Sequence, residues 1–458
     1  MHYEKFADGS AKCIEDEIPF DLPDGWAWER LSNLASFSGG KTPTTSRLEY
    51  WNGNILWVTS KDMKSKYIIS SQLRLSALGA EQMQIYQPGT LLLVARSGIL
   101  RHTLPVAILK ECATINQDLK AIVLYMPQLA EYIYICLKGM EAQLLLRYTK
   151  SGTTVENINF DEFQKVLLPI PPAQQIDRII SSAGNAECVV STIEDDKVAL
   201  AEYVAKTKSK ILDLSIRGQL VPQDPNDEPA SVLLERIRAE KEELIRQGKI
   251  KRDKKESVIF RGEDNSYYLR TGELVESLED WDFEELPDSW SVCCLGELCD
   301  YGNCTNVDTA DIADSAWILD LEDIEKDSGV VLQKVRQSER NAGSTKHRFH
   351  KGQVLYSKLR PYLNKVVLAD EDGYCTSEIL PLEFERNILS QYARYFLMSP
   401  TFLRYANKCS YGVKMPRLGT TDGKKAIISV PPIEEQKRIV AAIELAFAQF
   451  ASITGNLT

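Results

Sequence analysis

Several short polar segments of this 458-residue chain carry side chains that can pair with base edges or with phosphate. Arg and Lys suit guanine and phosphate, Asn and Gln suit adenine, and Gly allows a close backbone approach. In the first half of the chain the candidate DNA-binding residues are Lys41, Thr42, Lys61, Lys64, Arg96, Ser97, Arg101, His102, Asn116, Gln117, Lys150 and Thr153. In the second half they are Lys358, Arg360, Tyr362, Asn364, Lys365, Tyr411, Lys414 and Arg417. Each segment taken alone is equally compatible with a solvated turn, so the interpretation depends on how they are arranged.

The sequence offers no pattern of catalytic or metal-binding residues. The segment Ser38-Gly39-Gly40-Lys41-Thr42 resembles the end of a phosphate loop, but Ala35 stands where that pattern needs its first glycine. His347 and His350 have no acids or thiols at the spacing of a metal site. The one cysteine cluster lacks C-x-x-C pairs, and it consists of Cys293, Cys294, Cys299 and Cys304. We therefore predict a chain with no nucleophile, no metal and no cofactor of its own.

Composition and charge place the chain among globular proteins of two or three domains. Hydrophobic residues make up 44% and charged residues 26%, and the ten cysteines are too sparse for a disulfide framework. The formal net charge of −11 argues against wholesale coating of nucleic acid, so any DNA contact must come from local basic loops. No apolar run approaches the roughly 18 residues of a membrane span. We expect a cytoplasmic protein with no membrane partner.

An internal repeat sets the arrangement of the polar segments. Leu22-Pro23-Asp24-Gly25-Trp26 recurs 264 residues later as Leu286-Pro287-Asp288-Ser289-Trp290. Pro171-Pro172 recurs 260 residues later as Pro431-Pro432, with the landmarks between them in the same order. The sequence thus predicts two copies of one domain, over residues 1–172 and 257–432.

Each copy combines short strands with one longer helical region, which indicates an α+β fold. In the first copy we predict strands over 55–59, 90–94, 120–124 and 166–168, with helix over 129–146. In the second copy we predict strands over 316–319, 353–356, 365–368 and 427–430, with helix over 390–406.

Long amphipathic helices follow both copies. Between them, residues 173–256 form a helical spacer and linker, with a helix of about 45 residues that would be roughly 65 Å long. It is followed by a helix capped by Ser231 and by a basic tether over 249–255. After the second copy, residues 433–458 form a shorter helix. Since both helices carry a heptad pattern, pairing in a coiled coil is favoured over packing on their own domains. The predicted pairing residues are Ile179, Ala183, Val190, Ile193, Leu200, Val204, Ile211, Leu214, Ile439, Ile443 and Phe450.

These features together resemble one family, the DNA specificity subunit of type I restriction–modification systems. The resemblance rests on the repeated Leu-Pro-Asp-x-Trp segment, on Asn116-Gln117 and on the repeated Pro-Pro-x-x-x-x-Arg-Ile segment. Further residues that carry it are Ser38-Gly39-Gly40, Thr42-Pro43, Arg96-Ser97-Gly98, Arg101-His102 and Ser357-Lys358-Leu359-Arg360-Pro361-Tyr362.

The resemblance implies two target recognition domains, each reading half of a bipartite site in double-stranded DNA. The long helices would form an antiparallel coiled coil that spaces them and docks two methylation subunits. Those subunits would carry S-adenosylmethionine, restriction subunits would carry ATP, and this chain would be catalytically silent. Because the second helix is about half the length of the first, self-association is an alternative way to cover the first.

Two other classes of protein stay open. A defence-system adaptor could use the same fold to bind protein, and its loops would be apolar rather than basic. A single-chain modification enzyme would need a catalytic half, which this sequence lacks.

Overall fold

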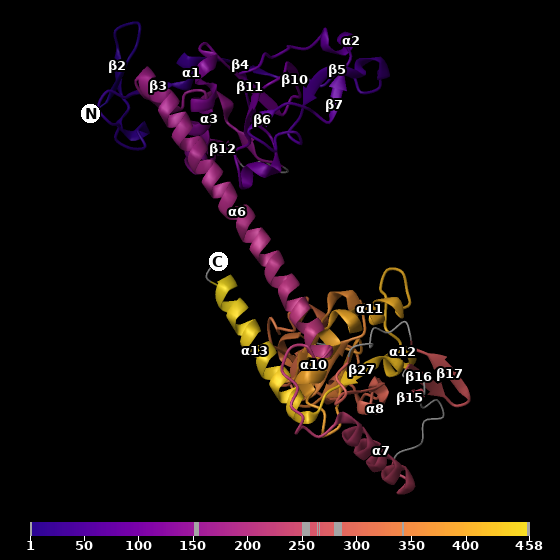
Figure 1. Ribbon diagram of the computed structural model, residues 1–458. Coiled ribbons are helices and arrows are strands. Elements are labelled where there is room, and N and C mark those ends of the chain that lie inside the picture. The colour runs from indigo at the N-terminus through magenta and orange to yellow at the C-terminus, as the bar shows by residue number, and fades with distance from the viewer. Residues whose placement is uncertain are drawn as a thin grey trace. The chain divides into compact units, whose positions relative to one another are not determined.

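The chain folds into two units, residues 1–194 and 195–458, and the division between them falls inside one long helix (Figure 1). The computed structural model describes residues 2–150, 155–249, 257–262, 264, 266–278, 286–340 and 343–455.

The first unit is built on a five-stranded sheet of order β4-β11-β8-β9-β6. Its central strand β8 (Leu91–Val94) is buried along its whole length. Leu91 and Leu93 face one hydrophobic cluster, while Leu92 and Val94 face another, which is why this strand is a continuous apolar run. The other strands are β4 (Ala35–Gly39), β6 (Tyr67–Ile68), β9 (Val106–Leu109) and β11 (Leu119–Leu124).

Helices cover one face of this sheet, and a second sheet packs on the other. Helices α3 (Ala130–Gly139) and α4 (Glu141–Tyr148) supply Ile133, Leu137 and Leu144 to the first cluster. The second sheet has the order β10-β5-β7, with β5 (Trp51–Val58), β7 (Leu73–Leu75) and β10 (Ala113–Ile115). Smaller elements are β1 (Tyr3–Lys5), β2 (Ala11–Cys13), α1 (Leu31–Leu34), α2 (Ala77–Ala80), β12 (Thr149–Lys150), β13 (Asn157–Ile158) and α5 (Phe160–Phe163).

The second unit repeats this plan. Strand β23 (Val354–Ser357) is again buried on both faces, with Val354 and Tyr356 in one cluster and Leu355 in another. It lies between β24 (Val366–Leu368) and β26 (Ile379–Leu382). A five-stranded sheet packs on it, with β19 (Asn306–Val307), β20 (Trp317–Leu319), β21 (Val335–Arg336), β22 (Lys346–Phe349) and β25 (Gly373–Cys375).

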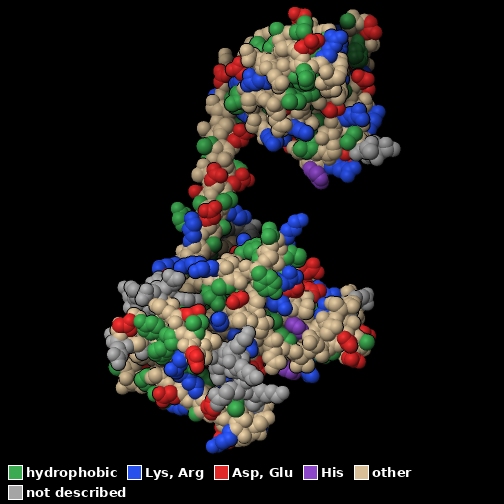
Figure 2. Space-filling view, turned by 90° about the vertical axis from the view of Figure 1, so that its right-hand side faces the viewer, with side chains coloured by type: hydrophobic (Ala, Val, Ile, Leu, Met, Phe, Trp, Pro, Cys, Tyr) green, Lys and Arg blue, Asp and Glu red, His purple; other side chains and the backbone are tan. Residues whose placement is uncertain are grey.

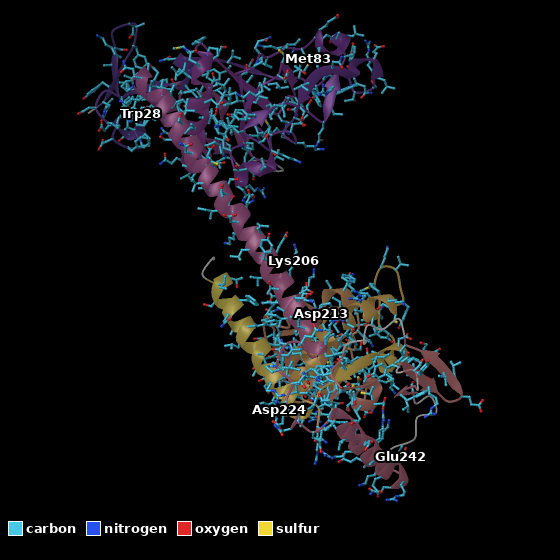
Figure 3. All side chains as sticks on the ribbon, in the orientation of Figure 1. Trp28, Met83, Lys206, Asp213, Asp224 and Glu242 are labelled. Carbon is cyan, nitrogen blue, oxygen red and sulfur yellow. The ribbon has the colours of Figure 1, made fainter. Side chains whose placement is uncertain are left out.

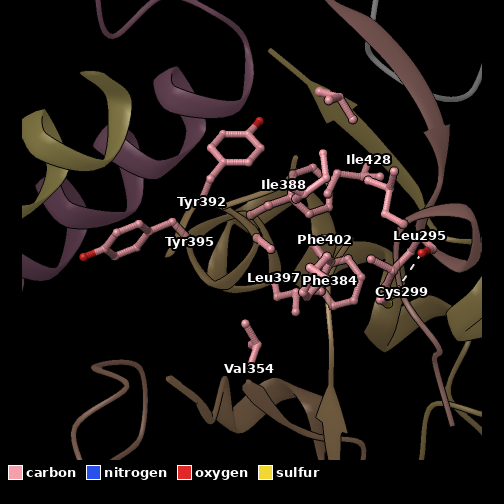
Figure 4. Close-up of a cluster of buried hydrophobic side chains, with 14 of the residues drawn as sticks. Leu295, Cys299, Val354, Phe384, Ile388, Tyr392, Tyr395, Leu397, Phe402 and Ile428 are labelled. Carbon is pink, nitrogen blue, oxygen red and sulfur yellow. Dashed lines mark hydrogen bonds between the residues drawn. The ribbon is translucent and has the colours of Figure 1, made fainter. Parts of the chain in front are cut away.

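Helices α10 (Ser390–Met398) and α11 (Pro400–Lys408) form the helical side of this core, shown in Figure 4. Phe402 of α11 belongs to that cluster together with Val354 and Leu397, and Cys299 donates to the carbonyl oxygen of Leu295 at 3.5 Å. The remaining elements are β15 (Ser257–Arg261), β16 (Tyr267–Thr271), β17 (Leu274–Ser277), α8 (Leu295–Leu298), α9 (Gln337–Arg340) and α12 (Thr420–Lys425).

Each copy is closed by a pair of strands, one that follows its Leu-Pro-Asp-x-Trp segment and one that precedes its Pro-Pro pair. In the first unit β3 (Ala27–Arg30) pairs with β14 (Leu167–Ile170), and in the second β18 (Ser291–Cys294) pairs with β27 (Ile427–Val430). Trp26 Nε1 donates to Gln175 Oε1 at 3.2 Å, and Trp290 Nε1 donates to Glu435 Oε2 at 2.9 Å. Each domain therefore ties its opening tryptophan to the helix that follows it.

The second of these contacts makes stability depend on pH. Burial raises the pKa of the Glu435 carboxyl above its ordinary value, although hydrogen bonds from Gln223 and Trp290 oppose the shift. Since the pKa is higher in the folded state, the contribution to stability is greatest at low pH and is lost as pH rises through the folded pKa.

We expect Glu435→Gln, which installs the amide found at Gln175, to remove this decline. The difference in Tm between variant and wild type should grow from about pH 4 to about pH 8. Glu434→Gln, at an exposed neighbour paired with Lys437, is the matched control and should leave the pH profile of Tm unchanged. Parallel profiles for wild type and Glu435→Gln would contradict the prediction.

The long helix α6 (Ala173–Ile216) and the last helix α13 (Ile433–Gly455) run antiparallel where they meet in the second unit. Lys208 Nζ lies 5.3 Å from the centroid of the Phe447 ring, and Leu212 and Ile216 share a core with Ile439 and Ile443. Of the other predicted pairing residues, Val204 is buried, and Ala183, Leu200, Ile211, Leu214 and Phe450 are half-buried.

The structure departs from the predicted pairing residues at Ile179 and Phe450, whereas the exposure of Val190 and Ile193 is expected where the shorter helix cannot reach. Ile179 packs on the core of the first unit, which includes residues of α3, rather than on α13. Val190 and Ile193 are 55% and 61% exposed. On α13 the contact is made by Phe447, whose ring also lies 6.0 Å from that of Tyr395, and Phe450 is not among the residues packed on the core. A straight helix turns once per 3.6 residues, so its buried stripe drifts away from a strict heptad.

The predicted spacer is not a separate body. The lower part of α6, marked by Lys206 and Asp213 in Figure 3, belongs to the second unit. Helix α7 (Ala230–Arg246) packs Leu233, Leu234 and Ile237 on the same core. Its N-cap is Pro229, so the prediction of Ser231 as the cap is wrong. The tether from 250 onwards lies outside the described residues.

One helix of the described chain is long and apolar enough to cross a membrane by length and composition, and it is α13. Its residues Ile439, Val440 and Ile443 are buried against the second unit, which accounts for part of its apolar character.

Candidate nucleic-acid interface

Four loops of the first unit meet at one end of its sheets. Strand β11 runs antiparallel to β4 and β8, with Lys120 opposite Gly39 and Leu119 opposite Val94. The loops after β4 and after β8 therefore lie beside the turn before β11. Strand β10 runs parallel to β5, with Ile115 opposite Val58, which brings the loop after β5 to the same end.

We call this end the first edge. The predicted residues that it brings together are Lys41, Thr42, Lys61, Lys64, Arg96, Ser97, Arg101, His102, Asn116 and Gln117. A backbone bridge between Arg96 and Asn157 attaches the β12–β13 hairpin, which carries Lys150. Thr153 lies outside the described residues. The first edge thus collects all of the described candidates from this half of the chain.

The glycines of the first edge allow two loops to touch. A Cβ atom on Gly40 would lie 2.2 Å from the carbonyl oxygen of Asn116, so no larger residue fits there. Lys41 N donates to the carbonyl oxygen of Ile115 at 3.1 Å, and Thr42 Oγ1 donates to Gln117 Oε1. This close approach explains the glycine at position 40 without a bound phosphate.

Some predicted contact residues instead hold the first edge together. Asn116 is only 6% exposed, and its side chain donates to Asp118 Oδ2 at 3.1 Å and accepts from Asp118 N at 3.2 Å. Arg101 Nε donates to the carboxylate of Glu156 and thereby holds the pKa of that carboxyl below its ordinary value. These two residues shape the loops.

Exposed cations remain at the first edge. Lys41, Lys61 and Lys64 are exposed and have no ion pair within the part of the chain that the structure describes. Asp62 organises the loop that carries Lys61 and Lys64, because it accepts from Thr59 N and from Gln72 N at 2.8 Å each. Figure 2 shows Lys and Arg side chains gathered along the lower rim of the first unit. Such a surface attracts phosphate.

The second unit forms an equivalent second edge. Strand β26 runs antiparallel to β23, with Ile379 opposite Ser357, and β25 runs parallel to β20, with Cys375 opposite Leu319. The described candidates that lie there are Lys358, Arg360, Tyr362, Asn364, Lys365, Tyr411, Lys414 and Arg417. The same topology therefore presents the same loops in both units.

Three of these candidates make internal contacts. Asn364 is 9% exposed, and its amide donates to the carbonyl oxygen of Met398 at 3.1 Å. Lys365 Nζ donates to the carbonyl oxygen of Leu321 at 2.6 Å, and burial lowers its pKa. Arg417 binds both oxygens of Glu378 through Nε at 3.1 Å. They position the second edge, and Lys358, Arg360, Tyr362, Tyr411 and Lys414 are left to contact a ligand.

The second edge is also less basic than the first. The loop after β20 carries Asp320, Glu322 and Asp323 where the first unit has Lys61 and Lys64 after β5. Arg340 neutralises part of this charge through ion pairs with Asp320 and Asp323, each at 2.6 Å.

Sequence reasoning missed the apolar residues of the second edge. Val413 is fully exposed and Met415 is also exposed. Both lie in a loop in which only polar residues were predicted to bind DNA. At the first edge it missed Gln82 and Gln84, which line a cavity of about 120 Å³ beside Gly39–Lys41. An exposed apolar residue inside a polar loop was the available signal in the first case.

Arg360 is in a left-handed backbone conformation, with φ of 50° and ψ of 62°. This conformation costs roughly 1 kcal/mol or more in any residue except glycine. Arg360 Nε is buried and has no hydrogen-bond partner among the described residues. Strain and an unpaired donor together indicate a residue held ready for a ligand.

Two variants separate the side chain from the strain. Arg360→Ala and Arg360→Gly should both weaken binding of the DNA target by about 1–3 kcal/mol if the guanidinium reads a base. Arg360→Gly should also raise the Tm, because glycine relieves the strain. Equilibrium binding and thermal unfolding measure the two effects. Wild-type affinity in either variant would remove Arg360 from the interface.

Within the described residues, no group of three or more His, Cys, Asp and Glu side chains could hold a metal ion. His347 is buried, and its Nδ1 lies 2.9 Å from the carbonyl oxygen of Ile379. Cys293, Cys294 and Cys299 are buried free thiols, and Cys304 is half-buried.

The match to a known protein family covers both copies of the repeat. A family model described as "Type I restriction modification DNA specificity domain" matches residues 23–183 and 287–457. Among curated relatives, the specificity subunit of the Escherichia coli type I restriction enzyme EcoR124I/EcoR124II is 28% identical over 171 residues, covering 37% of this chain and 42% of the relative. That of EcoAI, also from Escherichia coli, is 29% identical over 265 residues, covering 56% and 40%. The chain thus spans about two fifths of the length of these relatives.

Two solved structures share the fold. One, described as the structural basis of complex assembly and conformational transition of a type I R-M system, has a TM-score of 0.57 at 15% identity. The other, the HsdS subunit from Thermoanaerobacter tengcongensis, has a TM-score of 0.50 at 16% identity. Both comparisons cover 96% of this chain and 94% of the other.

Proposed function

Because the family model matches well over half of its residues, the chain belongs to the type I restriction–modification DNA specificity domain family, and we propose that it is the DNA-recognition subunit of such a system. Each unit would read one half of a bipartite site in double-stranded DNA. The observation that supports this most directly is the pair of equivalent edges, where the same loops of two repeated domains carry the exposed polar and cationic side chains.

The remaining parts of the proposal concern partners and chemistry. Two methylation subunits would dock on the long helices and bring S-adenosylmethionine, and restriction subunits would bring ATP hydrolysis. This chain would contribute recognition without catalysis and without a cofactor, in the cytoplasm. The neighbouring side chains of Val190 and Ile193 on α6 support docking, since both are more than half exposed and would gain from burial against a partner.

Methylation-sensitive sequencing tests the proposal. A host genome should show one bipartite methylated sequence when this chain and its methylation partner are present, and should lose it when only this chain is deleted. An unchanged methylation pattern after the deletion would reject the proposed function.

Isolated from its partners, the chain should bind DNA weakly and with strong salt dependence. Its net charge of −11 repels phosphate, and only the two edges oppose this. Adding the methylation subunit should tighten specific binding by orders of magnitude. Titration at several salt concentrations measures both effects. Nanomolar specific binding by the isolated chain in physiological salt would show that the partners are not needed to hold the DNA.

A further inference from the structure

A closed loop projects from the second edge, and we call residues 411–416 the finger. Tyr411 and Arg417 exchange two backbone hydrogen bonds, of 3.1 and 2.9 Å, at its base. Gly412 has a φ of 98°, and a Cβ atom there would lie 3.2 Å from the carbonyl oxygen of Met415. Its base and its first turn are therefore defined by hydrogen bonds and by glycine.

The finger is fastened to the other loops of the second edge. Arg417 at its base binds the carboxylate of Glu378, with Nη2 2.8 Å from Oε1. Arg360 N donates to the carbonyl oxygen of Pro416 at 2.7 Å, which ties the finger to the turn that carries Tyr362. A ligand at Arg360 and Tyr362 would therefore meet the finger as well.

The finger presents apolar side chains to solvent. Val413 is fully exposed, Tyr411 is 62% exposed and Met415 is 43% exposed, while Tyr362 on the neighbouring turn is 46% exposed. Val413 gains nothing from burial where it stands, and the other three side chains leave much of their surface in water. A ligand with apolar groups would bury these side chains and so be stabilised at this surface.

The charged side chains around the finger favour a ligand that carries negative charge. Lys414 is exposed on the finger, Lys358 and Arg360 flank its base, and Glu378 is neutralised by Arg417. Cations around an apolar tip match a duplex, whose phosphates surround base edges that include the thymine methyl group. The second edge has fewer free cations than the first. Apolar contacts could therefore contribute more to the recognition of DNA at the second edge.

We propose that the finger enters a groove of the duplex and that Val413 makes an apolar contact with a base of the second half-site. The inference rests on the proposed function and adds a recognition residue to it. Lys414 would contact phosphate beside that base. The first copy has Thr153 at the position that corresponds to Val413, so the two half-sites would be read differently there.

The full chain in complex with its methylation subunit should be incubated with a pool of random-sequence duplexes, and the retained DNA sequenced. Val413→Thr keeps the shape of the side chain and replaces one of its two methyl groups with a hydroxyl, and Val413→Ala removes both of these methyl groups. Both should flatten the base preference at one position of one half-site and lower affinity for the wild-type site roughly five- to twentyfold. The other half-site should be unchanged, and the Tm should stay within about 1 °C because the side chain is fully exposed.

Two further variants serve as controls. Val275→Ala, at a half-exposed valine of β17, should leave both half-sites unchanged. Lys414→Ala should weaken binding to all sequences alike and reduce the salt slope by about one, as expected for a phosphate contact.

Two modified duplexes distinguish the forms of apolar contact. If Val413 touches a thymine methyl group, deoxyuridine at that position should weaken wild-type binding and leave Val413→Ala unaffected. If Val413 wedges between bases, 2-aminopurine at that step should become more fluorescent with wild type than with Val413→Ala.

Three outcomes would overturn the inference. A pool that yields no bipartite sequence rejects the proposed function, and this inference with it. A bipartite sequence that is identical for wild type, Val413→Thr and Val413→Ala rejects the inference alone. Unchanged DNA selection with weakened copurification of the methylation subunit would show that the finger contacts protein.

Discussion

Replacing residues 22–170 with the matching region of a relative should exchange one half of the recognised DNA sequence and leave the other half unaltered. The segment contains both β3 and β14, whose pairing closes the first unit. It also carries every described loop of the first edge. Because the second unit has its own closing pair, β18 and β27, its edge should be unaffected by the graft.

The structure also indicates where such a graft should begin. Arg30, inside the grafted segment, binds Glu4 at 2.6 Å and Glu17 at 2.8 Å, and both of these precede residue 22. Hydrogen bonds from Arg30 lower the pKa of Glu17 to about 2, so the network favours the charged carboxylate. A graft of residues 1–170 keeps the three residues of one parent together. It should have the same new specificity as the shorter graft and a higher Tm.

Sequencing of methylated genomic DNA would show which half of the recognised sequence the graft has changed. A graft of either length that changes both half-sites would reject the model of two independent readers. A graft that folds, as judged by a cooperative thermal transition, and keeps the parental sequence in both half-sites would place recognition outside residues 22–170.

Strands buried on both faces were the most predictable part of the fold. The segments predicted at 90–94, 120–124 and 427–430 agree within one residue with β8, β11 and β27. A strand covered on both sides must be apolar throughout, and such a run is visible without knowledge of its neighbours. Strand β22, with the sequence Lys346-His347-Arg348-Phe349, was missed because its polar residues are accommodated by tertiary partners.

The sequence predicts which loops form the candidate site, but it does not predict which side chains of those loops are free to contact a ligand. Loop positions follow from where strands end, which is local information. Whether a side chain faces a ligand depends on the contacts that it makes inside its domain. Asn116 bonds to Asp118 in the same turn, and Asn364 bonds to the carbonyl oxygen of Met398 at the end of α10, so both are turned inward. The sequence marks Val413 as an apolar residue within a polar loop, but only the structure shows that its side chain is fully exposed.

Substitutions in the exposed stripe of α6, which includes Val190 and Ile193, should strongly weaken binding of the methylation subunit. Val190 and Ile193 are three residues apart, so they lie on the same face of the helix, and both are more than half exposed. Burying each against a partner would contribute roughly 1.5–3 kcal/mol. We expect Val190→Asp combined with Ile193→Asp to weaken binding of the methylation subunit at least a hundredfold, since two apolar contacts are lost and two carboxylates would be buried.

The free chain should tolerate the same double variant. Because both side chains are exposed, its Tm should change little. Val198→Asp is the matched control: Val198 is also exposed, but at 3.6 residues per turn it lies about 110° around the helix from the midpoint of the other two. Sedimentation of the chain with and without the methylation subunit would measure binding.

Sedimentation would also decide between the two ways of covering the stripe. If the free wild-type chain is a dimer through this face, the double variant should be a monomer while Val198→Asp stays dimeric. If the wild-type chain is a monomer, the stripe is left for the methylation subunit, and only the complex should be lost. A double variant that binds the subunit as tightly as wild type would show that docking uses another surface. Loss of binding in Val198→Asp alone would assign docking to a different face of the same helix.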